Sequence, residues 1–162
     1  MTPDAPGREH APDAGTVDDP IRHLADRAAI VDLCVRYARA LDSRDWQLLR
    51  TCFVPEVEVE YEGMEPIAGY DALEGVCRNV LGPLTASQHL LGNFAVDVDG
   101  DHAGCQCYLH AQHVREGVSG GDKYIVAGTY TDRLRRMPDG WRITHRRLDV
   151  VWTDGNDAVL GG

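Results

Sequence analysis

An aspartate and a tyrosine lie near the end of the first predicted helix, where they could take part in acid–base chemistry. Apolar residues recur at alternating spacings of three and four from Ile21 to Ala38, and the next position of that stripe is Asp42. Tyr37 belongs to a second row that flanks the stripe. Because burial of an unpartnered carboxylate is costly, Asp42 is expected to have a partner in the core. The plain alternative is that Asp42 only begins the turn at Ser43.

Two more polar residues are predicted to face apolar neighbours on strands. Tyr61 shares a strand face with Val57 and Val59, so its ring is expected to be buried and its hydroxyl to need a partner. Arg146 also shares a face with apolar residues, and such a guanidinium usually has an anionic partner or substrate. Core packing of Tyr61 and a surface ion pair of Arg146 remain open. Arg147, on the opposite face, is the rival of Arg146 if the strand register shifts.

Neither a metal nor a cofactor is expected from the sequence. His110 and His113 fall on opposite faces of one predicted strand, which argues against their binding one metal ion together. Cys105 and Cys107 share a strand face, a geometry that suits neither a relaxed disulfide nor a zinc site. The five cysteines are therefore expected as free thiols, with these two packed in the core. No glycine-rich nucleotide-binding pattern occurs in the chain.

Three helices followed by a sheet must position these residues. Asp19 and Pro20 form a helix start, Trp46 begins a short second helix, and a third helix is predicted over residues 70–81. Residues 57–61 alternate as a half-buried strand. Four long strands follow at about 88–98, 103–116, 122–136 and 141–152. The sequence therefore predicts an α+β domain with a mostly antiparallel sheet.

The strand that carries His89 shows a conflict in its alternation. Strict alternation puts His89 and Leu91 on one face and Phe94 on the other, so the two faces cannot both line one cavity. A bulge at Gly92-Asn93 would reconcile them. A curved sheet whose outer face is covered by a partner subunit would do the same.

Length, composition and charge limit the class of protein. The chain has 162 residues, enough for one domain, and no apolar run reaches the roughly 18 residues of a membrane helix. Residues 1–18 are expected as a disordered acidic leader, residues 19–155 as the domain, and residues 156–162 as a tail. The net charge of −10, with Lys123 as the single lysine, disfavours nucleic acid as a partner. Free thiols and the lack of a signal peptide predict a cytoplasmic protein.

Three segments of the sequence carry a family resemblance. They are Tyr37-Ala-Arg-Ala-Leu-Asp42-Ser-Arg-Asp45-Trp46 with Leu49, then Ser87-Gln88-His89, and Gly140-Trp141-Arg-Ile143 with Arg146 and Trp152. In this order, over roughly residues 20–155, they resemble the SnoaL-like branch of the nuclear-transport-factor-2-like superfamily. Within it the chain is most similar to scytalone dehydratase, bile-acid dehydratase and hexachlorocyclohexane dehydrochlorinase. The resemblance implies a cone-shaped α+β fold with three N-terminal helices packed on a curved sheet.

The resemblance also implies roles for particular residues. Asp42 matches an aspartate that hydrogen-bonds a catalytic histidine, and His89 matches that histidine. The carboxylate would fix the tautomer of the ring, and the ring would act as general base and acid. Tyr37, Tyr61 and Arg146 match positions that would polarise a carbonyl or a leaving group. The plain alternative for His89 is a histidine at a strand edge.

Three other positions depart from the scytalone dehydratase pattern. An ungapped alignment puts Gln112 at the place of that family's second histidine, with His110 two residues earlier on the same strand face. Gly128 and Tyr130 replace its serine and asparagine. These four residues are expected to contact the substrate, and scytalone itself is not the expected substrate.

The resemblance favours a cofactor-independent lyase or isomerase that acts on a small apolar oxygenated substrate, such as a polyketide-, steroid- or terpenoid-like molecule. A non-catalytic ligand-binding or assembly module of the same fold is the alternative. An epoxide hydrolase or cyclase is a second alternative, but its Asp-Arg-Asp cluster is not visible in the sequence. Apolar residues on both sheet faces predict a homo-oligomer, with a trimer ahead of a dimer because the most similar families are trimeric.

Overall fold

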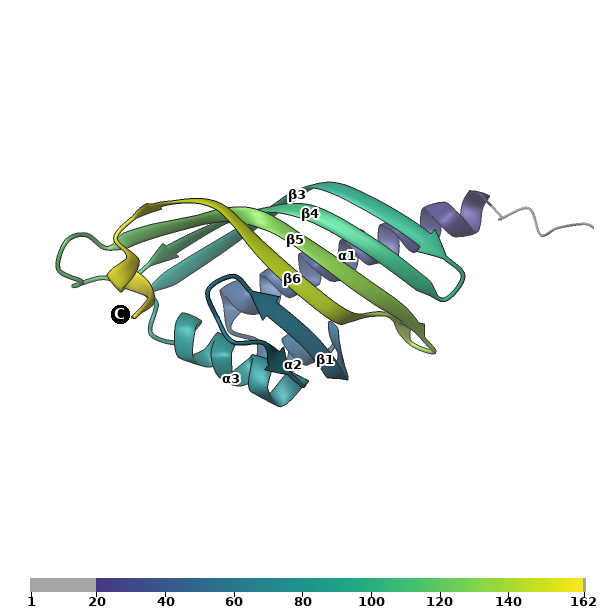
Figure 1. Ribbon diagram of the computed structural model, residues 1–162, viewed down its shortest axis with the longest axis horizontal. Coiled ribbons are helices and arrows are strands. Elements are labelled where there is room, and N and C mark those ends of the chain that lie inside the picture. The colour runs from purple at the N-terminus through teal and green to yellow at the C-terminus, as the bar shows by residue number, and fades with distance from the viewer. Residues whose placement is uncertain (1–19, 162) are drawn as a thin grey trace, which may run out of the picture.

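The three helices begin and end close to the positions that the sequence predicts. The computed structural model describes residues 20–161, in which α1 spans Pro20–Ser43, α2 spans Trp46–Arg50 and α3 spans Tyr70–Leu81 (Figure 1). Asp45 caps α2 by accepting a hydrogen bond of 2.9 Å from the backbone N–H of Leu48. The leader predicted for residues 1–18 lies outside the described residues. No helix of the described part is long and apolar enough to cross a membrane.

A six-stranded sheet forms the other layer, and five pairings join its strands in the order β2-β1-β6-β5-β4-β3. The strands are β1 (Phe53–Tyr61), β2 (Ile67–Ala68), β3 (Ala86–Asp99), β4 (His102–Val114), β5 (Lys123–Met137) and β6 (Gly140–Gly155). Neighbours are antiparallel except for β1 and β6, which run parallel. The predicted α+β class and mostly antiparallel sheet are confirmed. The sequence did not predict β2, because two residues are too few to show a period.

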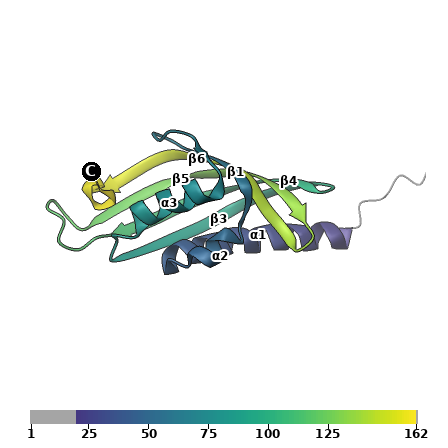
Figure 2. The same cartoon turned by 90° about the horizontal axis from the view of Figure 1, so that it is seen from below.

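The helices cover one face of the curved sheet and enclose the core. The long strands β3 to β6 arch over α3, and α1 runs lengthwise beside β3 (Figures 1 and 2). Trp141 and Ile143 of β6 contribute to this core, since both side chains are buried. The five cysteines are free and buried, as the sequence predicts. Apolar burial between these two layers is the main stabilising contribution to the fold.

The buried face of α1 differs from the predicted stripe. Ile21 and Leu24 are 76% and 64% exposed, whereas the buried face runs through Ile30, Leu33 and Tyr37. The second row of the sequence pattern is therefore the one that faces the sheet. The first turns of α1 reach the far end of the sheet in Figure 1, where little covers them. Sequence periodicity shows that a helix has a stripe, but the packing partner decides which of two adjacent rows is buried.

A bulge in β3 reverses the alternation of its side chains. The register with β4 shifts between Gly92 and Ala95, and Asn93 has a positive φ of 54°. The bulge predicted at Gly92-Asn93 is confirmed. As a result, His89 before the bulge and Phe94 after it both face the interior of the domain.

The chain closes with a short helix that the sequence did not predict. The 3₁₀-helix η1 (Asp157–Leu160) lies in the segment expected as a tail, and its Val159 is fully buried. Asn156 caps it by accepting a hydrogen bond from the backbone N–H of Ala158. η1 contacts β4 and β5, so these C-terminal residues are packed against the sheet.

An ion pair between β5 and β6 lies in the centre of the core. Asp132 and Arg146 are directly opposite each other in the antiparallel register, and their side chains are 1% and 0% exposed. Nε and Nη2 of Arg146 donate to the two carboxylate oxygens of Asp132 at 2.7 and 2.6 Å. This bidentate geometry compensates for the burial of both charges.

Removing one charge of this pair should destabilise the fold strongly. We expect Asp132→Asn to lower the free energy of unfolding by about 3–5 kcal/mol, because Arg146 would stay buried without a counter-charge. Urea unfolding followed by circular dichroism measures this change.

The matched control is Asp149→Asn, because the pair of Asp149 with Arg147 is about half exposed on each side. This control should cost at most about 1 kcal/mol. An equal loss in the two variants would contradict the role of the buried pair.

Candidate active site

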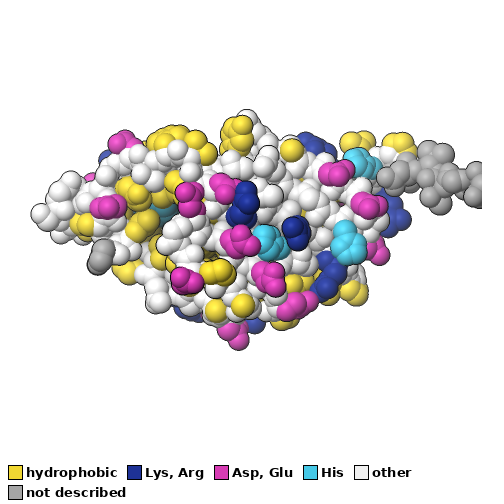
Figure 3. Space-filling model, viewed as in Figure 1, with side chains coloured by type: hydrophobic (Ala, Val, Ile, Leu, Met, Phe, Trp, Pro, Cys, Tyr) yellow, Lys and Arg dark blue, Asp and Glu magenta, His cyan; other side chains and the backbone are white. Residues whose placement is uncertain are grey.

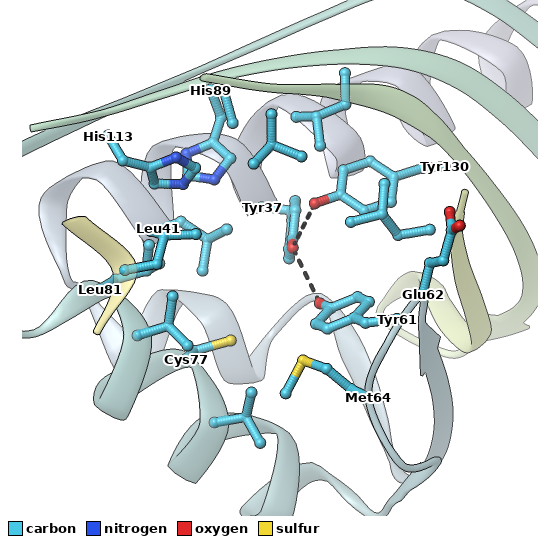
Figure 4. A pocket seen from close by; sticks show the side chains of 17 residues that line it. Tyr37, Leu41, Tyr61, Glu62, Met64, Cys77, Leu81, His89, His113 and Tyr130 are labelled. Carbon is cyan, nitrogen blue, oxygen red and sulfur yellow. Dashed lines mark hydrogen bonds between the residues drawn. The ribbon is translucent and has the colours of Figure 1, made fainter. Parts of the chain in front are cut away.

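A largely apolar cavity of about 320 Å³ lies between the sheet, α1 and α3 (Figure 4). The turn after β1 and the helix η1 complete its walls. Most of its lining side chains are aliphatic or sulfur-containing: Leu41, Met64, Val76, Cys77, Val80, Leu81, Leu109, Ala111, Val126, Leu148 and Leu160. Polar groups therefore reach it at few points, as in a typical small-molecule site.

One of those points is His89 of β3, which is bonded to Asp42 at the end of α1. Nδ1 of His89 lies 2.6 Å from Oδ1 of Asp42, and the backbone N–H of His89 donates to Oδ2 at 2.9 Å. The side chain of His89 is 5% exposed and lines the cavity, whereas that of Asp42 is 26% exposed and lies behind it. The distance between Nδ1 and Oδ1 is that of a direct hydrogen bond, as the hypothesis of a His89–Asp42 pair requires. The arrangement leaves Nε2 of His89 as the nitrogen not used by Asp42.

Asp42 is held as a carboxylate by several donors. Ser87 donates to Oδ1 at 3.2 Å, in addition to the two bonds from His89. Burial alone would raise the pKa of Asp42, but the hydrogen bonds from His89 and Ser87 together bring it below its ordinary value. Asp42 lies at the edge of the buried face of α1 and not in the middle of an apolar stripe. It therefore remains ionised beside the ring at neutral pH.

A second histidine, His113 of β4, stands next to His89. The two ring centroids are 5.7 Å apart with nearly perpendicular planes, and His113 is buried. Burial, and next the neighbouring His89, lower its pKa from 6.5 to about 4. His113 is therefore neutral near pH 7, and its Nδ1 has no hydrogen-bond partner within the described residues. The sequence analysis placed it opposite His110 but assigned it no role, although it shares a strand face with the apolar Leu109 and Ala111.

Three tyrosine hydroxyls meet at another part of the cavity (Figure 4). The hydroxyl of Tyr37 lies 3.2 Å from that of Tyr130 and 3.4 Å from that of Tyr61. Burial raises the pKa of all three well above the ordinary value, so each hydroxyl keeps its proton. Two contacts use two of the three protons. One hydroxyl proton is left to donate to an acceptor oxygen in the cavity.

Sequence comparison assigns this architecture to a family. The family model of the SnoaL-like domain matches residues 22–147. The chain belongs to the SnoaL-like family. An uncharacterized protein of Mycobacterium tuberculosis is 34% identical to this SnoaL-like chain over 128 residues, which cover 78% of this chain and 86% of the relative.

Two further comparisons come from proteins with descriptive names. The terrestric acid biosynthesis cluster protein E of Penicillium crustosum is 29% identical over 144 residues, covering 85% of this chain and 91% of that protein. The crystal structure of a type 2 hexachlorocyclohexane dehydrochlorinase, LinA, superposes with a TM-score of 0.76 at 20% identity, covering 89% of this chain and 97% of that one. The structural match shows that the two share the nuclear-transport-factor-2-like fold.

Arg146 does not line the cavity of this SnoaL-like domain, contrary to the expectation from sequence. Its guanidinium lies over the rings of Tyr37 and Tyr130, 4.0 and 4.2 Å from their centroids, and is paired with Asp132. It therefore cannot touch a molecule in the cavity directly. Arg147 is not its replacement, because that side chain is exposed and paired with Asp149.

Three of the four expected substrate contacts also lie elsewhere. His110 is on the outer face of the sheet, where its ring packs against Trp152. Gln112 lies on that outer face too and donates to the carbonyl oxygens of His113 and Tyr124. Gly128 allows close approach of β5 and β6, since a Cβ there would lie 2.4 Å from the carbonyl oxygen of Asp149. Of the four, only Tyr130 lines the cavity. The expectations for His110 and Gln112 were wrong because the ungapped alignment assigned the wrong face of β4 to the cavity.

The described residues do not bring three or more His, Cys, Asp or Glu side chains together in a geometry that could hold a metal ion. The polar groups of the cavity are instead one carboxylate-bound imidazole, one neutral imidazole, three phenol hydroxyls and the carboxylate of Glu62. This set can accept and donate protons and can bind an oxygen atom.

Acidification should destabilise the domain through His113. Because its folded-state pKa of about 4 lies below 6.5, the unfolded chain binds a proton that the folded chain does not, and stability rises with pH between those values. The free energy of unfolding should therefore fall by about 2 kcal/mol from pH 7 to pH 5. Urea unfolding at a series of pH values measures this slope.

The slope should vanish in His113→Gln, which is neutral at every pH and still faces His89 and Asp42. The exposed His102 provides the control, and His102→Gln should keep the slope. A slope that persists in His113→Gln would show that another group takes up the proton.

Proposed function

We propose that this protein is a cofactor-independent lyase or isomerase that acts on a small apolar oxygenated substrate through His89 and Asp42. The observation that carries the proposal is a carboxylate-bound histidine facing an apolar cavity that also holds three tyrosine hydroxyls. An elimination next to a carbonyl needs a base for the proton, a donor for the departing group and stabilisation of the oxygen. These residues can supply all three.

In the proposed reaction His89 first acts as base. Asp42 accepts the Nδ1–H bond, so Nε2 takes a proton from the carbon next to the carbonyl and the C–H electron pair forms an enolate. The carboxylate stabilises the resulting imidazolium. The ring then returns the proton to the departing hydroxide as its bond to carbon breaks and a C=C bond forms. In an isomerisation the same proton returns to another carbon.

The tyrosine hydroxyls are proposed to bind the carbonyl oxygen and stabilise its developing charge. Their unused proton suits one acceptor atom. Arg146 is a positioning residue here, because its guanidinium holds the rings of Tyr37 and Tyr130 without reaching the cavity.

His113 is proposed to take the role that the sequence analysis gave to Gln112 and His110. As a neutral imidazole beside His89, it can offer a hydrogen bond to the leaving group without competing for the substrate proton.

The relatives agree with this class of chemistry. The dehydrochlorinase of the same fold is named for an elimination, and the Penicillium protein for a biosynthetic cluster, which supports a substrate from secondary metabolism. The epoxide hydrolase alternative is less well supported. Asp132 and Arg146 are sealed behind the tyrosines and do not line the cavity.

A chromogenic probe can test the proposed base. In 5-nitrobenzisoxazole, removal of the ring C–H proton breaks the N–O bond and gives a nitrile and a coloured phenolate. We expect turnover above the buffer rate, loss of it in His89→Ala, and a decrease of about 10²–10⁴ in Asp42→Asn, whose amide cannot stabilise the imidazolium.

Two exposed residues provide matched controls: Asp32→Asn on the same helix and His102→Ala on the sheet should leave turnover unchanged. If wild-type and His89→Ala proteins turn over the probe alike, the base hypothesis fails and the non-catalytic ligand-binding module takes its place. Native mass spectrometry of the purified protein would then identify what the cavity holds.

We also propose that the protein is a homo-oligomer, with a trimer ahead of a dimer. Leu90, Tyr108, Val151 and Trp152 form an outer apolar patch on the convex face of the sheet, and each is at least 48% exposed. Among residues 20–161, no Lys, Arg, Asp or Glu side chain lines the groove they border. Two copies of a chain with a net charge of −10 repel each other. This repulsion is expected to be weaker where an uncharged apolar patch, and not an acidic surface, faces the second copy.

Light scattering after size-exclusion chromatography should give the mass of two or three chains. Val151→Asp should yield a monomer, because the new carboxylate would be buried in the interface. Val35→Asp, on the exposed side of α1, is the control and should leave the mass unchanged. A monomeric wild-type protein at micromolar concentration would contradict the proposal.

A further inference from the structure

The charges around the cavity are unevenly distributed. Among residues 20–161 no Lys or Arg lines the cavity, and Glu62 is the one Asp or Glu that does. Arg146, the nearest cation beneath the tyrosines, is bound by Asp132 and shielded by two aromatic rings. A negatively charged guest would therefore find no counter-ion inside.

Glu62 is fixed at the rim. It follows the last residue of β1, and its backbone N–H donates to the carbonyl oxygen of Leu148 on β6 at 3.2 Å. Its carboxylate Oε2 accepts a hydrogen bond of 2.7 Å from the backbone N–H of Val150. Two hydrogen bonds, one from the backbone and one to the carboxylate, thus hold Glu62 against β6, while its side chain remains exposed.

The surface around this side of the molecule carries both acidic side chains and Arg115, whose guanidinium lies next to Gly161 at the end of η1. In Figure 3 the hydrophobic area between η1 and the turn after β1 has acidic side chains near it, whereas most Lys and Arg groups lie toward the other half. Residues 20–161 carry more acidic than basic side chains. At the rim itself, among residues 20–161, Glu62 is the one Asp, Glu, Lys or Arg side chain that lines the cavity, so a ligand entering there passes a negative charge.

We propose that the cavity selects uncharged substrates over anionic ones, and that Glu62 sets this preference at the entrance. Carboxylates, sulfonates and thioesters of phosphorylated carriers would be disfavoured as substrates. Two effects add up: an anion loses its hydration inside an apolar cavity without a cation, and it is repelled at the rim. The inference rests on the proposed function only in taking the cavity as the substrate site.

Two fluorescent probes with the same ring skeleton test this selection. N-phenyl-1-naphthylamine is uncharged, and 1-anilinonaphthalene-8-sulfonate differs from it by one sulfonate. We expect the wild-type protein to bind the neutral probe at least about tenfold more tightly at low salt, with the ratio narrowing as salt screens the rim charge.

Glu62→Gln is the informative variant, because its amide oxygen can still accept the Val150 hydrogen bond while the charge is lost. It should tighten binding of the sulfonate about 3- to 10-fold and leave the neutral probe unchanged. Glu58→Gln removes the same charge from the exposed face of β1, away from the cavity, and should change neither probe. Cys77→Phe fills the cavity and should weaken binding of the neutral probe.

The inference is overturned if the two probes bind alike, if Glu62→Gln changes neither, or if Cys77→Phe leaves the neutral probe unaffected. These measurements are independent of turnover. If Glu62-dependent selection is found without any elimination activity, the proposed reaction fails and the charge selection stands as a property of a binding site. If turnover is found without selection, only the present inference fails.

Discussion

The buried ion pair of Arg146 with Asp132 is the interaction on which the cavity most depends. A guanidinium in the core needs a counter-charge, and the antiparallel register of β5 and β6 puts Asp132 directly opposite. Asp132 accepts hydrogen bonds from Nε and Nη2 of Arg146, whereas the buried Nη1 has no hydrogen-bond partner within the described residues. The faces of Tyr37 and Tyr130 cover the cation on its other sides, a favourable arrangement for aromatic rings. The same contacts fix where the tyrosine hydroxyls point. Arg146 therefore positions the tyrosine hydroxyls at one end of the cavity, although its own guanidinium does not line the cavity.

The opposite end depends on a local irregularity of the sheet. Without the bulge at Asn93, His89 and Phe94 would face opposite sides of β3, and either the histidine or the apolar half of the strand would leave the interior. Asp42 then joins α1 to β3 through two bonds to His89, one from the ring and one from the backbone. The carboxylate therefore orients the imidazole and also ties the helix end to the strand. Structural and chemical roles coincide in one residue.

The two polar ends are separated by aliphatic walls, and this separation sets what the cavity can do. In the proposed reaction the acidic C–H is adjacent to the carbonyl, so this part of the substrate would have to lie between His89 and the tyrosine hydroxyls. The fold hosts many reactions, so these few side chains carry the chemistry rather than the architecture. Glu62 adds a further restriction at the rim without touching either polar end.

The sequence by itself determined the helices, the long strands and the α+β class, because each depends on local periodicity and turn chemistry. It offered the bulge in β3 as one of two alternatives, and the register of β3 with β4 shows the bulge. The resemblance carried by its motifs brought Asp42 and His89 together as a hypothesis, and the structure places them within hydrogen-bond distance. Which row of α1 is buried, and that η1 packs against the sheet, were decided by tertiary contacts.

The partner of Arg146 and the residues of β4 that face the cavity could not be predicted from the sequence, because both depend on how strands and layers pack together. That Arg146 would be bound by Asp132 depends on the register between β5 and β6, which shifts at Ala127 and Gly128 and again at Arg133 and Leu134. That His113 and not His110 or Gln112 faces the cavity depends on which face of β4 the helices cover. Alternation along one strand divides residues into two sets, but only the packing of the other layer decides which set is inside.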